Sequence, residues 1–194
     1  MFTNIYHNIV NYFQYEKADD TNFMKEMKSI KLYNGLIEKL NNHETKLLQR
    51  YGGSINCKKG CSDCCMLESV FSIEAYMIYD YAIDAGIIPE SFTSDKREDN
   101  CIFLKDKSCA IYPVRPVICR THGYPIFTEG RVDICPENFK EISSIDSEYI
   151  LDLENVNNAI ASINIIFQKE IDEEFFESPR ISLKELKDSI RSRF

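Results

Sequence analysis

The chain has 194 residues, of which 44% are hydrophobic, so it is long enough for one domain whose core needs no disulfides to offset a small size. Its net charge of −8 argues against a nucleic-acid-binding surface, because phosphate contacts need a clustered basic face. The first residues lack the basic and apolar regions of a secretory signal, and no apolar run approaches the ~20 residues of a membrane span. We therefore expect a cytoplasmic protein with reduced thiols and no membrane partner.

The segment 22–51 is predicted to form a helix. Its apolar residues recur mostly at three- and four-residue steps, which makes one apolar stripe. The stripe consists of Phe23, Met27, Ile30, Tyr33, Ile37, Leu40, Leu47 and Tyr51. Gly52 and Gly53 are expected to end this helix.

All eight cysteines lie between residues 57 and 135, and four of them fall within 57–65. They are Cys57, Cys61, Cys64, Cys65, Cys101, Cys109, Cys119 and Cys135. Cysteines used as small hydrophobic residues would be scattered through the core. Closely spaced thiols on a loop with Gly60 can instead converge on one soft metal ion or cluster. The residues favour metal binding, with structural disulfides and packing cysteines as alternatives.

A second helix is predicted to begin at Ser72, a good N-cap with Glu74 in the first turn, and to end at Gly86. Its apolar face would carry Ala75, Tyr76, Ile78, Tyr79, Ala82 and Ile83. The polar segment 89–100 is expected to be a surface loop. Segments 101–104 and 109–112 then predict a short β-hairpin, which would bring Cys101 and Cys109 together.

A long helix is predicted over about 147–170. One face would carry Leu153, Val156, Ile160, Ile163 and Phe167. The acidic run 172–174 and Pro179 break it, and a capping box from Ser182 to Glu185 starts a final short helix.

The expected fold class is mainly α with minor β, in which helices surround an irregular cysteine-rich centre with a short β-hairpin. We expect an N-terminal helical segment (1–53), a cysteine-cluster metal-binding domain (54–140) and a C-terminal helical segment (141–194) in one globular unit.

The adjacent Cys64 and Cys65 restrict how the thiols can be shared. Side chains of adjacent residues point in different directions, so two such cysteines rarely bind one tetrahedral ion together. Eight thiols could fill two four-cysteine zinc sites, or one iron–sulfur cluster and one zinc site, or one site with four spare thiols. The spacing of Cys57, Cys61 and Cys64 also matches the loop of radical enzymes that cleave S-adenosylmethionine, but the chain lacks the βα alternation of their barrel.

The order of these cysteines resembles that of the YkgJ-like CxxCxxCC cysteine-cluster family of zinc- or iron-chelating domains. The resemblance covers roughly residues 57–136, and its strongest part is the segment 109–120, Cys-Ala-Ile-Tyr-Pro-Val-Arg-Pro-Val-Ile-Cys-Arg. The chain departs from the pattern after Cys57, where three residues stand in a gap of two. The resemblance implies metal chelation. A related cluster in flagellin lysine N-methylases implies an iron–sulfur cluster, but this chain has no Gly-rich loop for a standard methyl-donor site.

Arg115 and Arg120 flank Cys119 and are candidate cofactor-binding residues. They could offset the negative charge of a thiolate-rich site or donate hydrogen bonds to its sulfurs. Alternatively, Arg115 could anchor loop carbonyls or a carboxylate. His122 could be a ligand or a hydrogen-bonded loop residue, and His43 is expected at the surface.

Three functions remain open, and no catalytic residue can be singled out. The first is a metal-binding protein that chelates zinc or iron, with a slight preference for iron, including a 4Fe–4S cluster. The second is an iron–sulfur enzyme of the redox or protein-methylation type. The third is an interaction module whose two long helices bind a protein partner.

Overall fold

The computed structural model describes residues 27–57, 61–89 and 101–194. The helices in this part are α3 (Lys28–Tyr51), α4 (Ser72–Asp84), α5 (Val117–Thr121), α6 (Leu153–Glu170) and α7 (Leu183–Arg191). The strands are short and comprise β1 (Ser69–Phe71), β2 (Leu104–Lys105), β3 (Ser108–Cys109), β4 (Ile126–Thr128), β5 (Arg131–Asp133), β6 (Leu151–Asp152) and β7 (Arg180–Ser182). The predicted class, mainly α with minor β, is confirmed. None of the described helices combines the length and apolar character that crossing a membrane requires.

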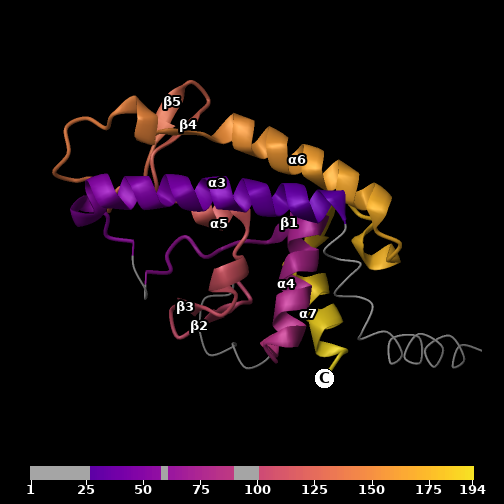
Figure 1. The fold of residues 1–194 in the computed structure, drawn as a ribbon. Helices are drawn as coiled ribbons and strands as arrows, with labels where there is room; N and C mark the ends of the chain where they lie inside the picture. The colour runs from indigo at the N-terminus through magenta and orange to yellow at the C-terminus, as the bar shows by residue number, and fades with distance from the viewer. Residues whose placement is uncertain (1–26, 58–60, 90–100) are drawn as a thin grey trace, which may run out of the picture.

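The two long helices, α3 and α6, pack along each other. In Figure 1, α6 lies with β4 and β5 on one side of α3, and α4, α5, α7 and the β2–β3 hairpin lie on the other side. The predicted stripes supply the packing, because most of their described residues are buried, among them Ile30, Tyr33, Ile160 and Phe167. Both stripes are therefore used inside the chain, and Phe23 lies outside the described residues.

Helix α4 begins at Ser72 as predicted, but Ser72 does not cap it. The Ser72 hydroxyl donates to Oδ1 of the buried Asn164 on α6 (2.8 Å), and the same oxygen accepts the backbone N–H of Ile73 (3.0 Å). The hydrogen bonds of the first turn of α4 are thus completed by a residue of α6. The end at Gly86 is confirmed: its φ is +63°, and the N–H of Ile87 reaches the carbonyl of Ala82 (2.8 Å), as in a Schellman motif.

The prediction that the long C-terminal helix begins near residue 147 was wrong. Residues Ser147–Tyr149 form one 3-10 turn, and β6 then pairs in parallel with β4. Helix α6 starts at Leu153, because Asp152 accepts the backbone N–H of Asn155 (2.9 Å) and caps it. Its end at Glu170 and the capping box of Ser182 and Glu185 are as predicted.

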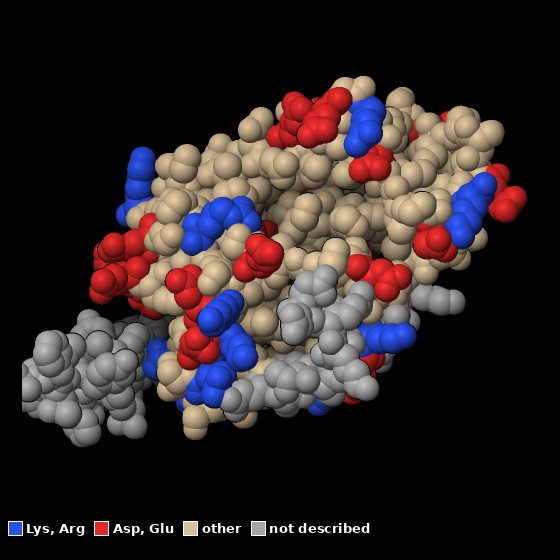
Figure 2. All heavy atoms as spheres, turned by 180° about the vertical axis from the view of Figure 1, so that it is seen from behind, with Lys and Arg blue, Asp and Glu red and all other residues tan. Residues whose placement is uncertain are grey.

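The predicted hairpin is present as the antiparallel pair of β2 and β3, although its ladder is shorter than expected. Asp106 and Lys107 form the turn with φ of +48° and +58°, the geometry of a type I′ hairpin. The predicted surface loop 89–100 lies almost wholly outside the described residues. On the face in Figure 2, Lys and Arg side chains lie among Asp and Glu side chains.

Candidate metal centre

All eight cysteines are free thiols. Cys61, Cys64 and Cys119 are exposed and the other five are partly buried. None of them is fully buried or disulfide-bonded in the structure, although Cys101 and Cys109 pack against the main hydrophobic core. Thiols are soft donors that suit zinc and iron, so the chemistry of the donor set fits a metal centre.

Cys57 and Cys135 are brought together beside Gly123. A Cβ atom at Gly123, whose φ is +89°, would lie 3.2 Å from the Cys57 sulfur and 3.6 Å from the Cys135 Cβ. A side chain at position 123 would crowd the Cys57 sulfur, and the positive φ favours glycine at this position.

Hydrogen bonds from Asn138 hold Cys57 beside Gly123. Its side chain is buried, and its amide nitrogen donates to the Gly123 carbonyl (2.6 Å) and to the Cys57 sulfur (3.4 Å). Its amide oxygen accepts the backbone N–H groups of Asn56 (2.8 Å) and Cys57 (3.3 Å). One buried amide therefore holds the Cys57 loop against the segment that follows α5. The sequence offered no signal for it, because its partners lie far along the chain.

Cys65, Cys101 and Cys109 are brought together by main-chain pairing. The N–H of Cys101 donates to the carbonyl of Cys65 (2.8 Å), and the N–H of Leu104 donates to the carbonyl of Cys101 (3.0 Å). Leu104 in turn faces Cys109 across the hairpin. The expectation that the hairpin gathers Cys101 and Cys109 agrees with this register.

The thiols also act on one another electrostatically. Burial, followed by the neighbouring Cys109, raises the pKa of Cys101 to about 11. Cys119 is exposed as a residue, yet the protein packed around its thiol, together with Cys101 and Cys109, raises its pKa to about 12. A hydrogen bond between the thiols of Cys64 and Cys65 raises the pKa of Cys64 and lowers that of Cys65. Because ligands must be deprotonated, a metal ion binding here would release protons.

The thiols are near one another but do not yet close on one point. Within the described ranges, no three His, Cys, Asp or Glu side chains form a group that could hold a metal ion. A metal ion would therefore have to draw the sulfurs inward. Exposure of Cys61 and Cys64 on a short loop leaves them room for this movement.

Arg115 and Arg120 are mostly buried and bind protein oxygens. Arg115 donates to both carboxylate oxygens of Glu44 (3.2 and 3.1 Å), and its guanidinium lies 4.0 Å from the centre of the Tyr112 ring. Arg120 donates to the carbonyls of Arg115 (2.9 Å) and Pro113 (2.7 Å). These bonds agree with the anchoring role, while the charge of Arg115 also lowers the pKa of Cys109 against the dominant effect of burial.

Two carboxylates have hydrogen-bonding roles that the sequence analysis did not predict. Glu44 accepts Arg115 and also the hydroxyl of Tyr124 (2.7 Å). Glu74, expected only to favour a helix start, accepts the N–H groups of Phe71 (3.1 Å) and Val117 (2.8 Å) and so ties α4 to α5. The acidic residues are too numerous in the sequence for these two to stand out.

Two of the three histidines, His43 and His122, lie within the described residues. His122 is exposed, and His43 is half-buried rather than at the surface as expected. The Nε2 atom of His43 is buried without a hydrogen-bond partner, and burial lowers the pKa of this side chain.

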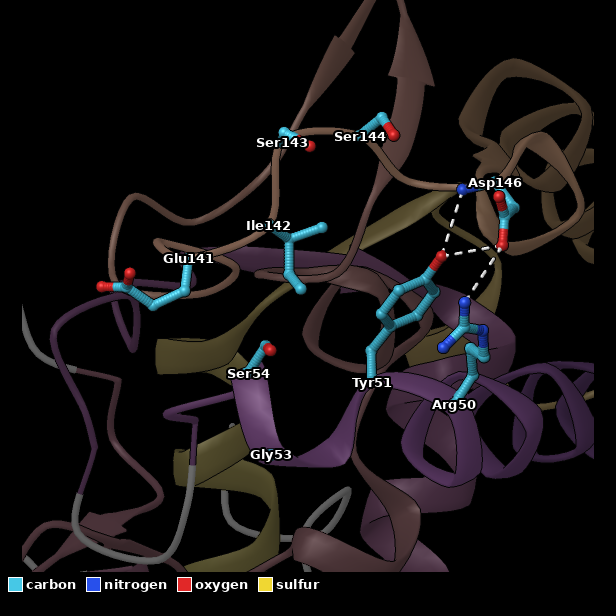
Figure 3. A pocket seen from close by; sticks show the side chains of 9 residues that line it. All are labelled: Arg50, Tyr51, Gly53, Ser54, Glu141, Ile142, Ser143, Ser144 and Asp146. Atoms are coloured by element: carbon cyan, nitrogen blue, oxygen red, sulfur yellow. Dashed lines mark hydrogen bonds and ion pairs between the residues drawn. The ribbon is translucent and has the colours of Figure 1, made fainter.

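A pocket of about 430 Å³ at the end of α3 contains no cysteine (Figure 3). Tyr51 donates to a carboxylate oxygen of Asp146 (3.0 Å) and accepts the Asp146 N–H (3.2 Å), and Arg50 lies 3.9 Å from the same carboxylate. Its polar groups therefore hold the loop around residue 146 against α3.

Comparison with known families points to the cysteine-rich part of the chain. Residues 56–141 match the family model CxxCxxCC, described as "Putative zinc- or iron-chelating domain". The matched range contains all eight cysteines and both arginines. The match confirms the resemblance drawn from the cysteine spacing. Comparisons with curated proteins and with solved structures gave no match.

Proposed function

We propose that the protein binds zinc or iron through its eight cysteines. The observation that carries the proposal is that all eight cysteines are free thiols and lie within the range that matches a zinc- or iron-chelating family. Thiolates at several of these positions would hold the metal, and the bound metal would act as a Lewis acid or, as an iron–sulfur cluster, as an electron carrier.

Iron is the slightly preferred metal. Three cysteines on one loop plus a distant fourth resemble the spacing of iron–sulfur ligands. The exposure of Cys61, Cys64 and Cys119 would leave a bound metal or cluster within reach of solvent. This accessibility would let a partner or an electron acceptor reach the centre, as a transfer or redox role requires.

Accessibility also favours an enzyme of the redox or methylation type as the second candidate. An enzyme needs an open coordination position, and exposed thiols are where a ligand could be displaced. The interaction-module candidate receives less support, because the apolar stripes of α3 and α6 are buried within the chain.

Replacement of single thiols tests metal binding. We expect Cys64→Ser and Cys119→Ser each to lower the bound metal and the melting temperature, because metal-binding energy contributes to folding. Ser144→Ala, at an exposed position in the pocket away from the thiols, is the control and should match the wild type. Full metal content and wild-type melting in both cysteine variants would refute the proposal.

A further inference from the structure

We propose that the eight thiols form two neighbouring four-thiolate sites, divided at the peptide bond between Cys64 and Cys65, each for one zinc or iron centre. The first site consists of Cys57, Cys61, Cys64 and Cys135. The second consists of Cys65, Cys101, Cys109 and Cys119. This inference rests on the proposed function, because it assigns ligands within the same cysteine cluster.

The first site is built around Asn138 and Gly123. Cys57 and Cys135 meet over Gly123, where a single added carbon would contact both residues. The N–H of Asn138 also donates to the Cys135 carbonyl (2.9 Å) while its side chain donates to the Cys57 sulfur (3.4 Å). Beyond burial and this hydrogen bond, the charges that act on Cys57 are those of Cys61, Cys135 and Cys64.

The second site is built on the β2–β3 hairpin. The backbone bond from Cys101 to Cys65 (2.8 Å) joins the end of the cysteine loop to the start of the hairpin, which carries Cys109 opposite Leu104. Beyond Cys64 and burial, the charges that act on Cys65 are those of Cys101, Cys109 and Cys119. Cys119 belongs here because Cys101 and Cys109 are the charges that act on it most.

The number of thiols in each group decides to which of the two sites Cys64 belongs. Its thiol acts on both Cys57 and Cys119, so proximity alone leaves it between the two groups. The second group already has four thiols without it, and the first has three. A closed zinc or iron–sulfur site takes four thiolates. Cys64 therefore completes the first site, and the hydrogen bond between the thiols of Cys64 and Cys65 places the two sites side by side.

A cobalt(II) titration tests the division, because tetrahedral thiolate binding of cobalt gives an intense absorption that counts occupied sites. The wild type should bind two equivalents. Cys135→Ser and Cys109→Ser should each bind one, Cys57→Ser/Cys135→Ser should still bind one, and Cys135→Ser/Cys109→Ser should bind none. Far-UV circular dichroism checks that each variant keeps its helices.

The outcomes separate this inference from the proposed function. A wild type that binds none of cobalt, zinc and iron overturns the proposed function. A wild type that binds one equivalent, or a single replacement that removes all binding from a folded variant, overturns the division and leaves metal binding intact.

If the variants do not fold, a measurement on the wild-type protein tests the division instead. Zinc-loaded protein is treated with increasing chelator in the presence of N-ethylmaleimide, and the modified cysteines are identified by mass spectrometry. We expect the four thiols of one site to be modified together while the other four stay protected. Simultaneous modification of all eight, or mixed modification across the two groups, would overturn the division.

Discussion

At the scale of single residues, Asn138 places Cys57 in the centre. It is one of the few fully buried polar side chains, and both ends of its amide are used for hydrogen bonds. Its side-chain N–H group donates to the Cys57 sulfur and would stabilise a thiolate there, as outer-shell donors do for metal ligands. Asn138 is thus a positioning residue that touches the ligand and not the metal.

Asn138→Asp should weaken metal binding by about 10–100-fold, the usual effect of losing an outer-shell partner. The substitution keeps the shape of the side chain but places a carboxylate oxygen against the Cys57 sulfur and the Gly123 carbonyl. Competition with a chromophoric chelator measures the affinity. Asn157→Asp, at an exposed position on α6, is the matched control. Equal affinities in the two variants would contradict the role given to Asn138.

The variant Arg115→Lys tests the geometry of the Arg115 guanidinium separately from its positive charge. Lysine keeps the positive charge near Cys109 but cannot grip both oxygens of Glu44 or stack over Tyr112 in the same way. We expect a loss of about 1–2 kcal/mol in the free energy of unfolding and faster release of metal to a chelator. Chemical denaturation and metal-release kinetics measure these effects. Unchanged metal retention would count against a role of Arg115 in the centre.

At the scale of elements, helix α4 depends on α6 for its first turn. The side-chain oxygen of Asn164 accepts hydrogen bonds from the Ser72 hydroxyl and the Ile73 N–H at the start of α4. Its side-chain nitrogen donates to the Pro179 carbonyl (3.0 Å), just before β7. Three segments that are distant in the sequence are therefore fixed by one buried amide. Since β1 pairs with β7, this contact also sets where the chain enters α4 after the cysteine loop.

Asn164→Ala should lower the free energy of unfolding by about 1–3 kcal/mol, because the buried N–H of Ile73 loses its acceptor. Asn157→Ala on the exposed face of α6 is the control, since it removes an amide from the same helix without a buried partner. Urea denaturation followed by circular dichroism measures both. If the two variants lose the same stability, the capping from α6 is not significant.

Glu74 gives the contact between α4 and α5 a pH dependence. Burial is the main effect on Glu74 and raises its pKa, although the N–H groups of Val117 and Phe71 oppose the rise. Because the pKa is higher in the folded chain than in the unfolded chain, the folded state holds the proton more tightly. The resulting stabilisation is complete below the ordinary pKa of 4.5 and is lost as the pH rises through the folded pKa.

Glu74→Gln should remove this pH dependence, because glutamine stays neutral. The free energy of unfolding of the wild type, relative to that of the variant, should fall as the pH increases from about 4 toward neutrality. Denaturation of metal-free, reduced protein at a series of pH values measures the difference without a contribution from metal release. A difference that does not change with pH would show that Glu74 does not titrate as described.

Local patterns predicted the elements well, and long-range contacts account for the errors. The stripe of α3, the stop at Gly86 and the capping box of α7 were predictable because their signals lie within a few residues. The start of α6 was missed because pairing of Leu151 with β4 interrupts the apolar pattern.

The same distinction holds for the candidate centre. The thiols could be named from their spacing, since clustered cysteines carry their own signal. Asn138, Glu44 and Glu74 could not, because each acts on residues that lie far away in the sequence. Polar residues of these types are common, and only the folded chain shows which of them are buried with a partner.

At the scale of the whole molecule, the helices form the frame and the cysteine loops lie against it. Helices α3 and α6 bury each other's stripes, while α5 and the β2–β3 hairpin lie on the other side of α3 from α6 in Figure 1. The cysteine-bearing segments contain little regular structure apart from the hairpin and α5. Bound metal would therefore stabilise the part of the molecule that its own secondary structure holds least.

The most direct test of a metal-held centre is the metal content and visible absorption spectrum of protein purified without oxygen. The proposed function predicts bound metal: iron with acid-labile sulfide and a brown colour, or colourless protein with stoichiometric zinc. Iron would raise the redox or enzyme candidate, and zinc would favour a structural role. Protein that holds no metal and has its thiols paired in disulfides would contradict the claim.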